Sequence, residues 1–430
     1  MSTHIPEQPR IEEVVKPRNR LLLNRNFTFL AIGQAISYLG DFVYSTTLLV
    51  WVFALTHSAA AVSSVLIAQY VPMFLLGPVA GVFVDRWNRR TTMVVADLSR
   101  MAVALLPLFV TDTLRLPIIY LGVFLISVFS RFFTPARAGI TQVIVTSEQQ
   151  AQAASVGQAT FALAMVLGPA LATPLFFAVG PFIACSINAA SFLVSALCLL
   201  ALRAPRAAFH PSLLSEKSGL KAVWSELSAS FHLIGTSRVL RVSVGMALIA
   251  MLGAGAIEAL GVIFVSQRLH VSSSLYGPLV ATGGVGILVG AVLAGLLATK
   301  MTSKTILTGS VFLLGLGLVI YGFQTWYVAA LLVYFLLSTP NGGVEVGFAP
   351  MMLNATPRAM IGRVQAVMET VMFGTSLVSI ALAGAASQFI PVWLIFVISG
   401  VLMALAGLFG WFALPGGFRP KGIETQTASD

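Results

Sequence analysis

Long apolar runs separated by short polar segments make up most of the sequence. Each run approaches or exceeds the ~20 residues that cross a bilayer as an α-helix. We predict twelve membrane-spanning helices, at residues 27–55, 59–84, 91–111, 116–145, 152–178, 181–202, 238–267, 274–299, 304–324, 326–355, 361–388 and 391–414. The chain is therefore predicted to be an all-α membrane protein.

Composition indicates the same class of protein. Of the 430 residues, 57% are hydrophobic and only 9% are charged. The mean hydropathy of +0.92 lies outside the range of soluble domains. The net charge of +10 is spread over short loops, and no basic domain is present that would bind nucleic acid. We interpret this charge as a determinant of membrane orientation.

Basic residues lie almost entirely in the loops on one side of the predicted bundle. Loops rich in Lys and Arg stay in the cytoplasm. With the N-terminus inside, the cytoplasmic segments carry Arg86, Arg89, Arg90, Arg203, Arg206, Lys217, Lys221, Lys300, Lys304, Arg358, Arg363, Arg419 and Lys421. The opposite side carries only Arg115 and Arg268. We therefore expect both termini in the cytoplasm, with residues 1–26 and 415–430 as tails.

The predicted spans form two groups of six, at residues 27–202 and 238–414. The connection between them, residues 203–237, has apolar residues at helical spacing. We expect an amphipathic helix there, lying on the cytoplasmic surface. This helix is either a regulatory or lipid-sensing element or a passive strut between the two halves.

The two halves also repeat one another in sequence. Gly295 and Lys300 stand in the second half where Gly81 and Arg86 stand in the first. These positions are 214 residues apart, and the same interval of 214 residues separates Arg131 from Glu345. A duplicated six-helix unit places a substrate site between the halves, near the middle of the membrane.

The loop between the second and third spans is short and polar. Its residues include Gly81, Asp85, Arg86, Arg89 and Arg90. An acidic side chain beside three arginines can tie helix ends together through charge-assisted hydrogen bonds. The loop is therefore a candidate conformational latch, or alternatively a basic loop that only sets the topology.

This loop resembles the signature between the second and third helices of the major facilitator superfamily. Asn88 stands where that family usually has glycine, and asparagine also tolerates a left-handed turn. A short run in the fourth span is similar to the sequence found in the branch that contains macrolide efflux proteins and enterobactin exporters. This run is Thr134, Pro135, Ala136 and Arg137. The resemblance implies a transporter of two pseudo-symmetric halves that works by alternating access in a bacterial plasma membrane.

A second resemblance lies in the fifth span. Gly168 and Pro169 match the centre of the antiporter signature of drug exporters, while Ala164, Ala172 and Thr173 replace its outer glycines. Small residues there still permit close helix approach. This similarity favours export over import.

Ionisable residues inside the spans are the strongest remaining signal. They are Asp41, Asp97, Arg100, Arg131, Arg137, Glu258, Glu345 and Glu369. A charge at the bilayer centre costs about 3 kcal/mol on insertion scales, so each needs a partner, water or a neutral form. Asp97 and Arg100 are spaced to form a pair within one helix. We expect Glu369 to be structural, reaching Arg363 or water.

Asp41 lies well inside the first span, with no basic residue one helical turn away. Because burial disfavours its charged form, it should be protonated part of the time, as a proton-coupling site requires. Arg131 of the fourth span is the natural counter-charge, and the family resemblance associates such an arginine with proton transfer. The alternative is a static buried pair.

Three further residues are candidates for lining the substrate cavity: Glu258, Glu345 and Arg137. Glycines flank both glutamates and expose the backbone around them. Each glutamate is a second titrating group, a site for a cationic part of the substrate, or a hydrogen-bonding group between helices. Arg137 or Arg131 could instead bind an anion.

The sequence thus predicts a proton-coupled exporter of small apolar or amphipathic, drug-like or macrolide-like compounds. The alternatives are a dedicated siderophore or metabolite exporter and a lipid transporter. No nucleophile with its base and no nucleotide loop is present, so we expect no enzyme activity and an ion gradient as the energy source. The spacing of Cys185, Cys198 and the histidines predicts no disulfide, metal or cofactor. Protons and membrane lipid are expected partners, and the protein is expected to be a monomer.

Overall fold

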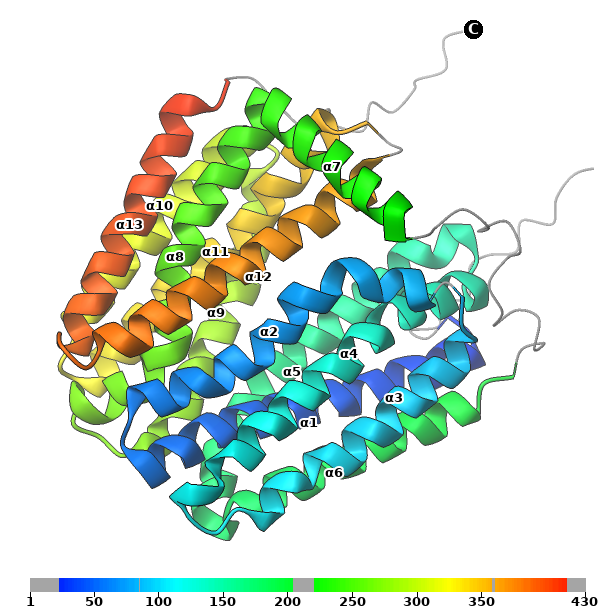
Figure 1. The fold of residues 1–430 in the computed structure, drawn as a ribbon. Helices are drawn as coiled ribbons and strands as arrows, with labels where there is room; N and C mark the ends of the chain where they lie inside the picture. The colour runs from blue at the N-terminus through cyan, green and yellow to red at the C-terminus, as the bar shows by residue number, and fades with distance from the viewer. Residues whose placement is uncertain (1–22, 85, 204–219, 358–359, 416–430) are drawn as a thin grey trace, which may run out of the picture.

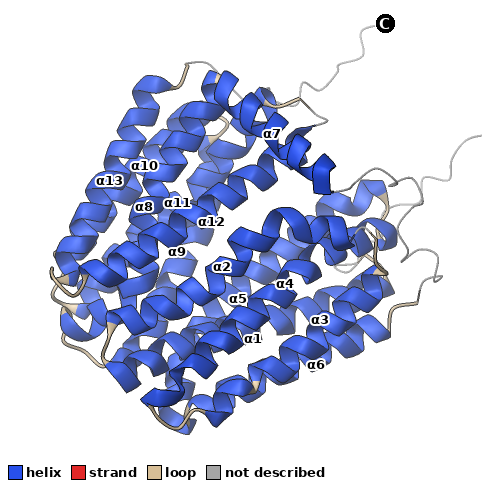
Figure 2. Ribbon diagram, viewed as in Figure 1, coloured by secondary structure: helices blue, strands red, loops and turns tan. Residues whose placement is uncertain are grey.

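The computed structural model describes residues 23–84, 86–203, 220–357 and 360–415. The described residues form helices joined by short loops and contain no strand (Figure 2). Twelve of the helices are long and apolar enough to cross a membrane. This confirms the predicted fold class and the number of spans.

The first half contains six long helices. They are α1 (Arg25–Thr56), α2 (Ala59–Val84), α3 (Arg89–Ala104), α4 (Leu116–Ile144), α5 (Gln150–Val179) and α6 (Pro181–Leu200). Short 3-10 segments lie between them, at Leu106–Phe109, Thr113–Arg115 and Ser147–Gln149. Most predicted boundaries of these spans agree with the structure to within a few residues.

The second half contains the other six spans. They are α8 (Arg238–Gln267), α9 (Tyr276–Leu297), α10 (Ser303–Gly322), α11 (Tyr327–Ala355), α12 (Ile361–Ala386) and α13 (Val392–Ala413). A 3-10 turn, Ser273–Leu275, precedes α9. The additional helix α7 (Leu220–Thr236) contacts α8 and α12 near the beginning of α12 (Figure 1). Ile234 of α7 is buried in a cluster with Val364 and Met368 of α12.

Side-chain caps determine where several helices begin. Asn24, Asn88, Ser237 and Thr302 each accept a hydrogen bond from the backbone N–H three residues later. Such caps satisfy one of the N–H groups that a helix start leaves unpaired. Asn88 has a φ of −65°. Its expected left-handed turn is therefore wrong, and the residue serves as a cap instead.

The third predicted span, 91–111, is interrupted in the structure. Helix α3 ends at Ala104, and a 3-10 turn containing Pro107 follows. Proline lacks an N–H and disfavours helical geometry in the residue before it. Hydropathy alone could not reveal this break, because the residues on both sides of it are apolar.

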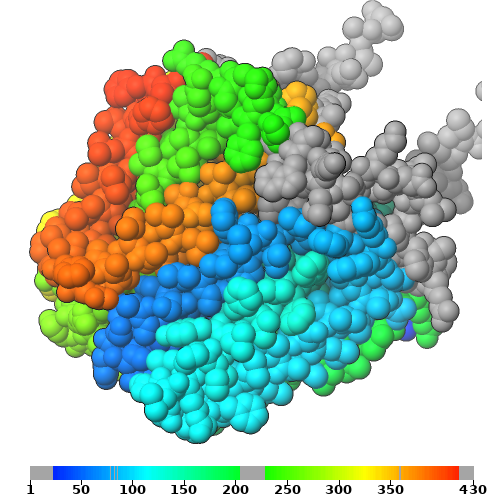
Figure 3. Space-filling view, viewed as in Figure 1, coloured from blue at the N-terminus to red at the C-terminus, as the bar shows by residue number. Residues whose placement is uncertain are grey.

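The two halves lie on opposite sides of an interface that is formed mainly by α2 with α12 and by α5 with α9 (Figure 1). In the space-filling view the surfaces of α2 and α12 meet (Figure 3). Ser63, near the start of α2, lies against Gly384, near the end of α12. On α5, the backbone of Pro169 lies against Gly277 at the start of α9. The halves therefore meet toward the ends of these helices that lie away from α7.

Glycines allow close helix contacts in the second half. Gly286 and Gly290 of α9 lie against the backbone carbonyls of Phe335 and Thr339 of α11. These two glycines therefore allow α9 and α11 to pack closely. Gly295 is an exception, since nothing lies within 4 Å of where its Cβ would be.

Candidate functional site

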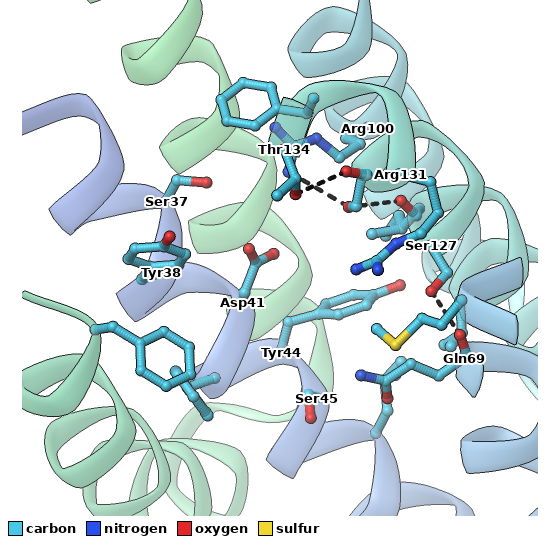
Figure 4. A pocket seen from close by; sticks show the side chains of 18 of the residues that line it. Ser37, Tyr38, Asp41, Tyr44, Ser45, Gln69, Arg100, Ser127, Arg131 and Thr134 are labelled. Carbon is cyan, nitrogen blue, oxygen red and sulfur yellow. Dashed lines mark hydrogen bonds between the residues drawn. The ribbon is translucent and has the colours of Figure 1, made fainter. Parts of the chain in front are cut away.

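A cavity of about 280 Å³ lies inside the first half, between α1, α2 and α4. Successive turns of α1 form one wall of this cavity, because Ser37, Tyr38, Asp41 and Ser45 share a helix face (Figure 4). The opposite wall comes from α2, α3, α4 and α5, and its polar members are Gln69, Arg100, Ser127, Ser130, Arg131, Thr134 and Arg137. We call this space the first cavity.

Asp41 is half-buried, and its carboxylate faces the first cavity (Figure 4). Arg100 of α3 and Asn188 of α6 are close enough to interact with it electrostatically. The buried Nδ2 of Asn188 makes no hydrogen bond of normal geometry. The Asp41 carboxylate is therefore partly removed from solvent, lies beside a cation and an amide, and can be reached from the cavity.

Arg100 is itself paired with Asp97, one turn earlier in α3. This ion pair is buried, with Asp97 at 0% and Arg100 at 4% exposure. The guanidinium also lies 4.3 Å from the ring centroid of Phe133 and 4.5 Å from that of Phe192. The predicted pair within one helix is confirmed.

Arg131 lines the first cavity opposite Asp41, but the described residues show no salt bridge between the two. Its Cζ lies 5.9 Å from the ring centroid of Phe373 in α12, and Glu369 one turn away acts on it electrostatically. Its Nε is buried and makes no hydrogen bond. Arg131 therefore connects the first cavity to the second half. Glu369 also accepts a hydrogen bond from Gln365 at 3.2 Å. Its contact with Arg363 stays a prediction.

Arg137 lies where the first cavity meets a second, of about 540 Å³, between the beginnings of α1 and α5 and the end of α4. It donates hydrogen bonds to Tyr38 and, at 3.2 Å, to Gln34. The Tyr38 ring packs edge-on against Phe161, with centroids 5.3 Å apart. All four side chains line both cavities, so the two spaces form one path with an aromatic and a cationic wall.

Glu258 and Glu345 lie outside these cavities. The Tyr70 hydroxyl of α2 donates to Glu258 Oε2 at 2.8 Å, across the interface between the halves. Glu345 of α11 is exposed. The structure therefore separates the predicted cavity residues into Arg137 in the first half and two glutamates in the second.

The basic loop after α2 is bound to carbonyls of its own half. Arg89 donates to the Gly139 carbonyl of α4 at 3.4 Å. Arg90 donates to the carbonyls of Leu199, at 2.9 Å, and Leu200, at the end of α6. Cations are favoured at such helix C-termini. Asp85 lies outside the described residues, and Gly81 has no atom within 4 Å of a Cβ position. The latch of Gly81, Asp85, Arg86, Arg89 and Arg90 stays a prediction.

Gly168 and Pro169 lie where α5 packs against α1 on one side and α9 on the other. A Cβ on Gly168 would meet Phe42 of α1, with the Phe42 backbone at 3.3 Å. The Pro169 carbonyl contacts Gly277 of α9 in the second half. This part of α5 therefore connects the cavity wall in α1 to the opposite half.

A sequence profile of the Major Facilitator Superfamily matches residues 30–372. The chain belongs to this superfamily. Members of it are transporters of small molecules, so the protein is a multi-pass transporter of a bacterial plasma membrane. The resemblance noted in the sequence is thereby confirmed.

Several relatives of this transporter carry names. The uncharacterized MFS-type transporter YfiS of Bacillus subtilis is 25% identical over 390 residues, which are 88% of this chain and 91% of YfiS. Macrolide efflux protein A of Streptococcus pyogenes is 24% identical over 299 residues, 67% of this chain and 71% of that protein. The putative bacilysin exporter BacE of Bacillus subtilis is 29% identical over 176 residues, 40% of this chain and 43% of BacE.

Solved structures show the same fold. The nucleoside transporter NupG superposes with a TM-score of 0.74 at 13% identity, covering 90% of this chain and 100% of NupG. An auto-inhibited peptide transporter of the POT family has a TM-score of 0.70 at 15% identity, covering 92% and 99%. Both agree with the twelve-helix major facilitator fold.

Four residues of this site were not predicted as functional. Arg100 and Asn188 flank Asp41, Phe161 packs on Tyr38, and Tyr70 bonds Glu258. Each comes from a different helix than the residue it contacts. A sequence-based signal existed only for Arg100, which is an ionisable residue inside a span.

Proposed function

We propose that this transporter exports small apolar or amphipathic compounds in exchange for protons, by alternating access. The observation that carries the proposal is Asp41, a half-buried carboxylate that faces a cavity inside a membrane-spanning bundle. Arg131 faces the same cavity and interacts with Glu369 of the other half. A proton on Asp41 would alter the charge of the cavity, and Arg131 would convey that change to the second half.

Two observations support export of such compounds. Three relatives are named for efflux or export, two of them for macrolides and the third for bacilysin. In addition, the aromatic rings of Tyr38, Phe42 and Phe161 form a connected apolar surface along the path between the two cavities. Such a surface suits a ligand that is largely apolar.

The positions of the second cavity and of the contacts between the halves indicate the conformational state. The second cavity lies at the ends of α1, α4 and α5 that the loop charges assign to the cytoplasm. The contacts between the halves lie toward the other ends of the helices. We therefore assign this structure to the inward-open state, which takes up a compound for export.

The test uses purified transporter in proteoliposomes with an imposed proton gradient. The compounds are lipophilic dyes, a macrolide, a tetracycline and a catecholate siderophore. We expect gradient-driven movement of several amphipathic compounds. Asp41→Asn should reduce it by about 5–150-fold, the range that corresponds to coupling free energies of 1–3 kcal/mol. Asp112→Asn, which makes the same chemical change in an exposed loop, is the matched control.

Each outcome has a distinct meaning. Full pH-driven movement in Asp41→Asn would refute the role of Asp41. Loss of movement in Asp112→Asn as well would show that the loss is not specific to the cavity. If none of the compounds moves in the wild type, drug-like export is wrong and lipid or metabolite transport must be tested.

A dedicated exporter of anionic metabolites or siderophores is the second candidate. Arg131 and Arg137 both line the first cavity and outnumber its unpaired carboxylate, Asp41. Movement of the siderophore alone in the same assay would favour this candidate over the first.

A further inference from the structure

Several carboxylates lie inside the membrane spans of the second half. Among those described, Glu258 alone accepts a hydrogen bond from a helix of the first half. The Tyr70 hydroxyl reaches its Oε2 at 2.8 Å. The Glu258 side chain is nevertheless exposed, so it remains accessible to a ligand between the halves. Among the described residues it forms no ion pair.

Aromatic rings surround this carboxylate from several helices. Tyr276 of α9 and Tyr334 of α11 are both close enough to interact with Glu258 electrostatically. Gly261, one turn after Glu258, makes room for Tyr276, since a Cβ there would lie 2.9 Å from Cε2 of that ring. On the other side, the Tyr70 ring meets Phe373 edge-on with centroids 5.7 Å apart. Tyr70, Tyr334 and Phe373 are half-buried and therefore present part of each ring.

Among the described residues, no salt bridge neutralises Glu258. Arg131 lies over Phe373, with its Cζ 5.9 Å from the ring centroid, and the carboxylate that acts on it is Glu369. A carboxylate in such a position, bonded only to a neutral phenol, lacks a compensating charge. Aromatic faces attract cations, and most strongly where water is excluded. A cation with an apolar shell would complement both this carboxylate and the surrounding rings.

We propose that Glu258, with Tyr70, Tyr276 and Tyr334, binds the ammonium group of an organic amine. This inference rests on the proposed transport of amphipathic compounds and specifies their class. A bound amine would contact α2 of the first half and α8, α9 and α11 of the second. It would therefore bind differently in the two arrangements of the halves, as a transported substrate must.

The test measures binding, without a gradient, to purified full-length transporter in detergent. The probe is a dansyl-labelled alkyl trimethylammonium compound, and the reference is its uncharged tert-butyl isostere, which has the same shape. We expect the wild type to bind the ammonium probe at least roughly tenfold more tightly, equivalent to about 1.4 kcal/mol. Glu258→Gln should bring the two affinities to within about threefold of each other. Tyr70→Leu, which removes one ring, should reduce the preference by a smaller factor.

Two variants keep the test interpretable. Glu148→Gln makes the same chemical change at an exposed position before α5 and should retain the full preference. Glu258→Asp keeps the charge and should retain a weaker preference, which shows that a loss in Glu258→Gln is due to charge and not to misfolding. Size-exclusion profiles of all variants should match the wild type.

The proposal is overturned if Glu258→Gln keeps the preference, if Glu148→Gln loses it, or if the wild type binds the isostere as tightly as the ammonium probe. The binding test can fail without the transport test failing, so the two failures can be distinguished. If the wild type prefers the ammonium probe but shows no proton-driven movement, the amine site is supported and proton coupling is refuted. If it shows proton-driven movement but no preference for the ammonium probe, proton coupling is supported and the amine site is refuted.

Discussion

The Asp97–Arg100 pair shows how one charged residue supports another inside the membrane. Both side chains are almost completely buried. The rings of Phe133 and Phe192 cover the guanidinium, and Arg100 in turn acts on Asp41 in the first cavity. The pair therefore stabilises the helix packing and also influences the charge state of the candidate proton site.

Arg100→Met should destabilise the protein strongly. It leaves Asp97 buried without its partner, which typically costs about 3–5 kcal/mol. Thermal unfolding in detergent should show a clear fall in Tm. The double variant Asp97→Asn with Arg100→Met should recover most of the loss, whereas Arg115→Met, in an exposed loop, should change stability by less than about 1 kcal/mol. A double variant as unstable as the single one would contradict this account.

At the scale of single residues, the sequence predicted which residues belong to the site. It predicted their contact partners less well. Asp97 and Arg100 could be paired because they lie one turn apart. Asp41 could be recognised as an isolated carboxyl, but its neighbours come from α3 and α6. The partner of Glu258 comes from the opposite half. Such contacts depend on how helices pack, which hydropathy does not encode.

Helix α5 contacts α1 on one side and α9 on the other, through the adjacent residues Gly168 and Pro169. Gly168 allows α1 to approach at Phe42, and Pro169 touches Gly277 of α9. A helix in this position can pass a displacement of the cavity wall to the other half. Close packing makes it sensitive to the addition of a single carbon atom.

Gly168→Ala should therefore destabilise the transporter even though alanine favours helix. The new Cβ would press on Phe42, and overpacking of this kind costs about 1–3 kcal/mol. Gly157→Ala in the same helix is the matched control, because nothing lies within 4 Å of its Cβ position. It should be neutral or stabilising by up to about 1 kcal/mol, the helix propensity difference. Equal Tm changes in both variants would argue against the close contact.

At the scale of elements, the spans could be predicted closely because each is a long apolar run bounded by polar loops. The main error was the end of α3, where Pro107 interrupts a continuously apolar segment. The role of Asn88 was also misjudged, since a cap and a left-handed turn use the same residue type. Capping geometry is visible only once the following helix has been placed.

The two halves meet along α2 with α12 and α5 with α9, toward one end of the bundle. The fold and the existence of an interface follow from the repeat in the sequence. The state of the transporter does not, because alternating access uses the same residues in both arrangements.

A disulfide between Ser63→Cys and Gly384→Cys should stop transport. A Cβ on Gly384 would lie 2.7 Å from that of Ser63, so a small shift gives the usual separation of about 3.8 Å. The pair is made in a background where Cys185 and Cys198 are serine. Oxidation should abolish flux in proteoliposomes, and a reductant should restore it, because the halves must separate here during the cycle.

The control is a disulfide within one half. Gly33→Cys would place its Cβ 3.2 Å from that of the native Cys198. This bond joins α1 to α6, and flux should continue after oxidation. If both disulfides leave flux intact, the halves do not separate at Ser63.

Among the residues that the structure describes, only helices of the first half line the two cavities. A compound held entirely within them reaches the second half only indirectly, through Arg131, and a ligand with nearly equal affinity for two states shifts neither. Such a compound would occupy the transporter without driving its cycle and would act as an inhibitor. Only a molecule long enough to reach the second half as well gains binding energy from the exchange. The length of a compound, more than its affinity, would then decide whether it is transported or inhibits the transporter.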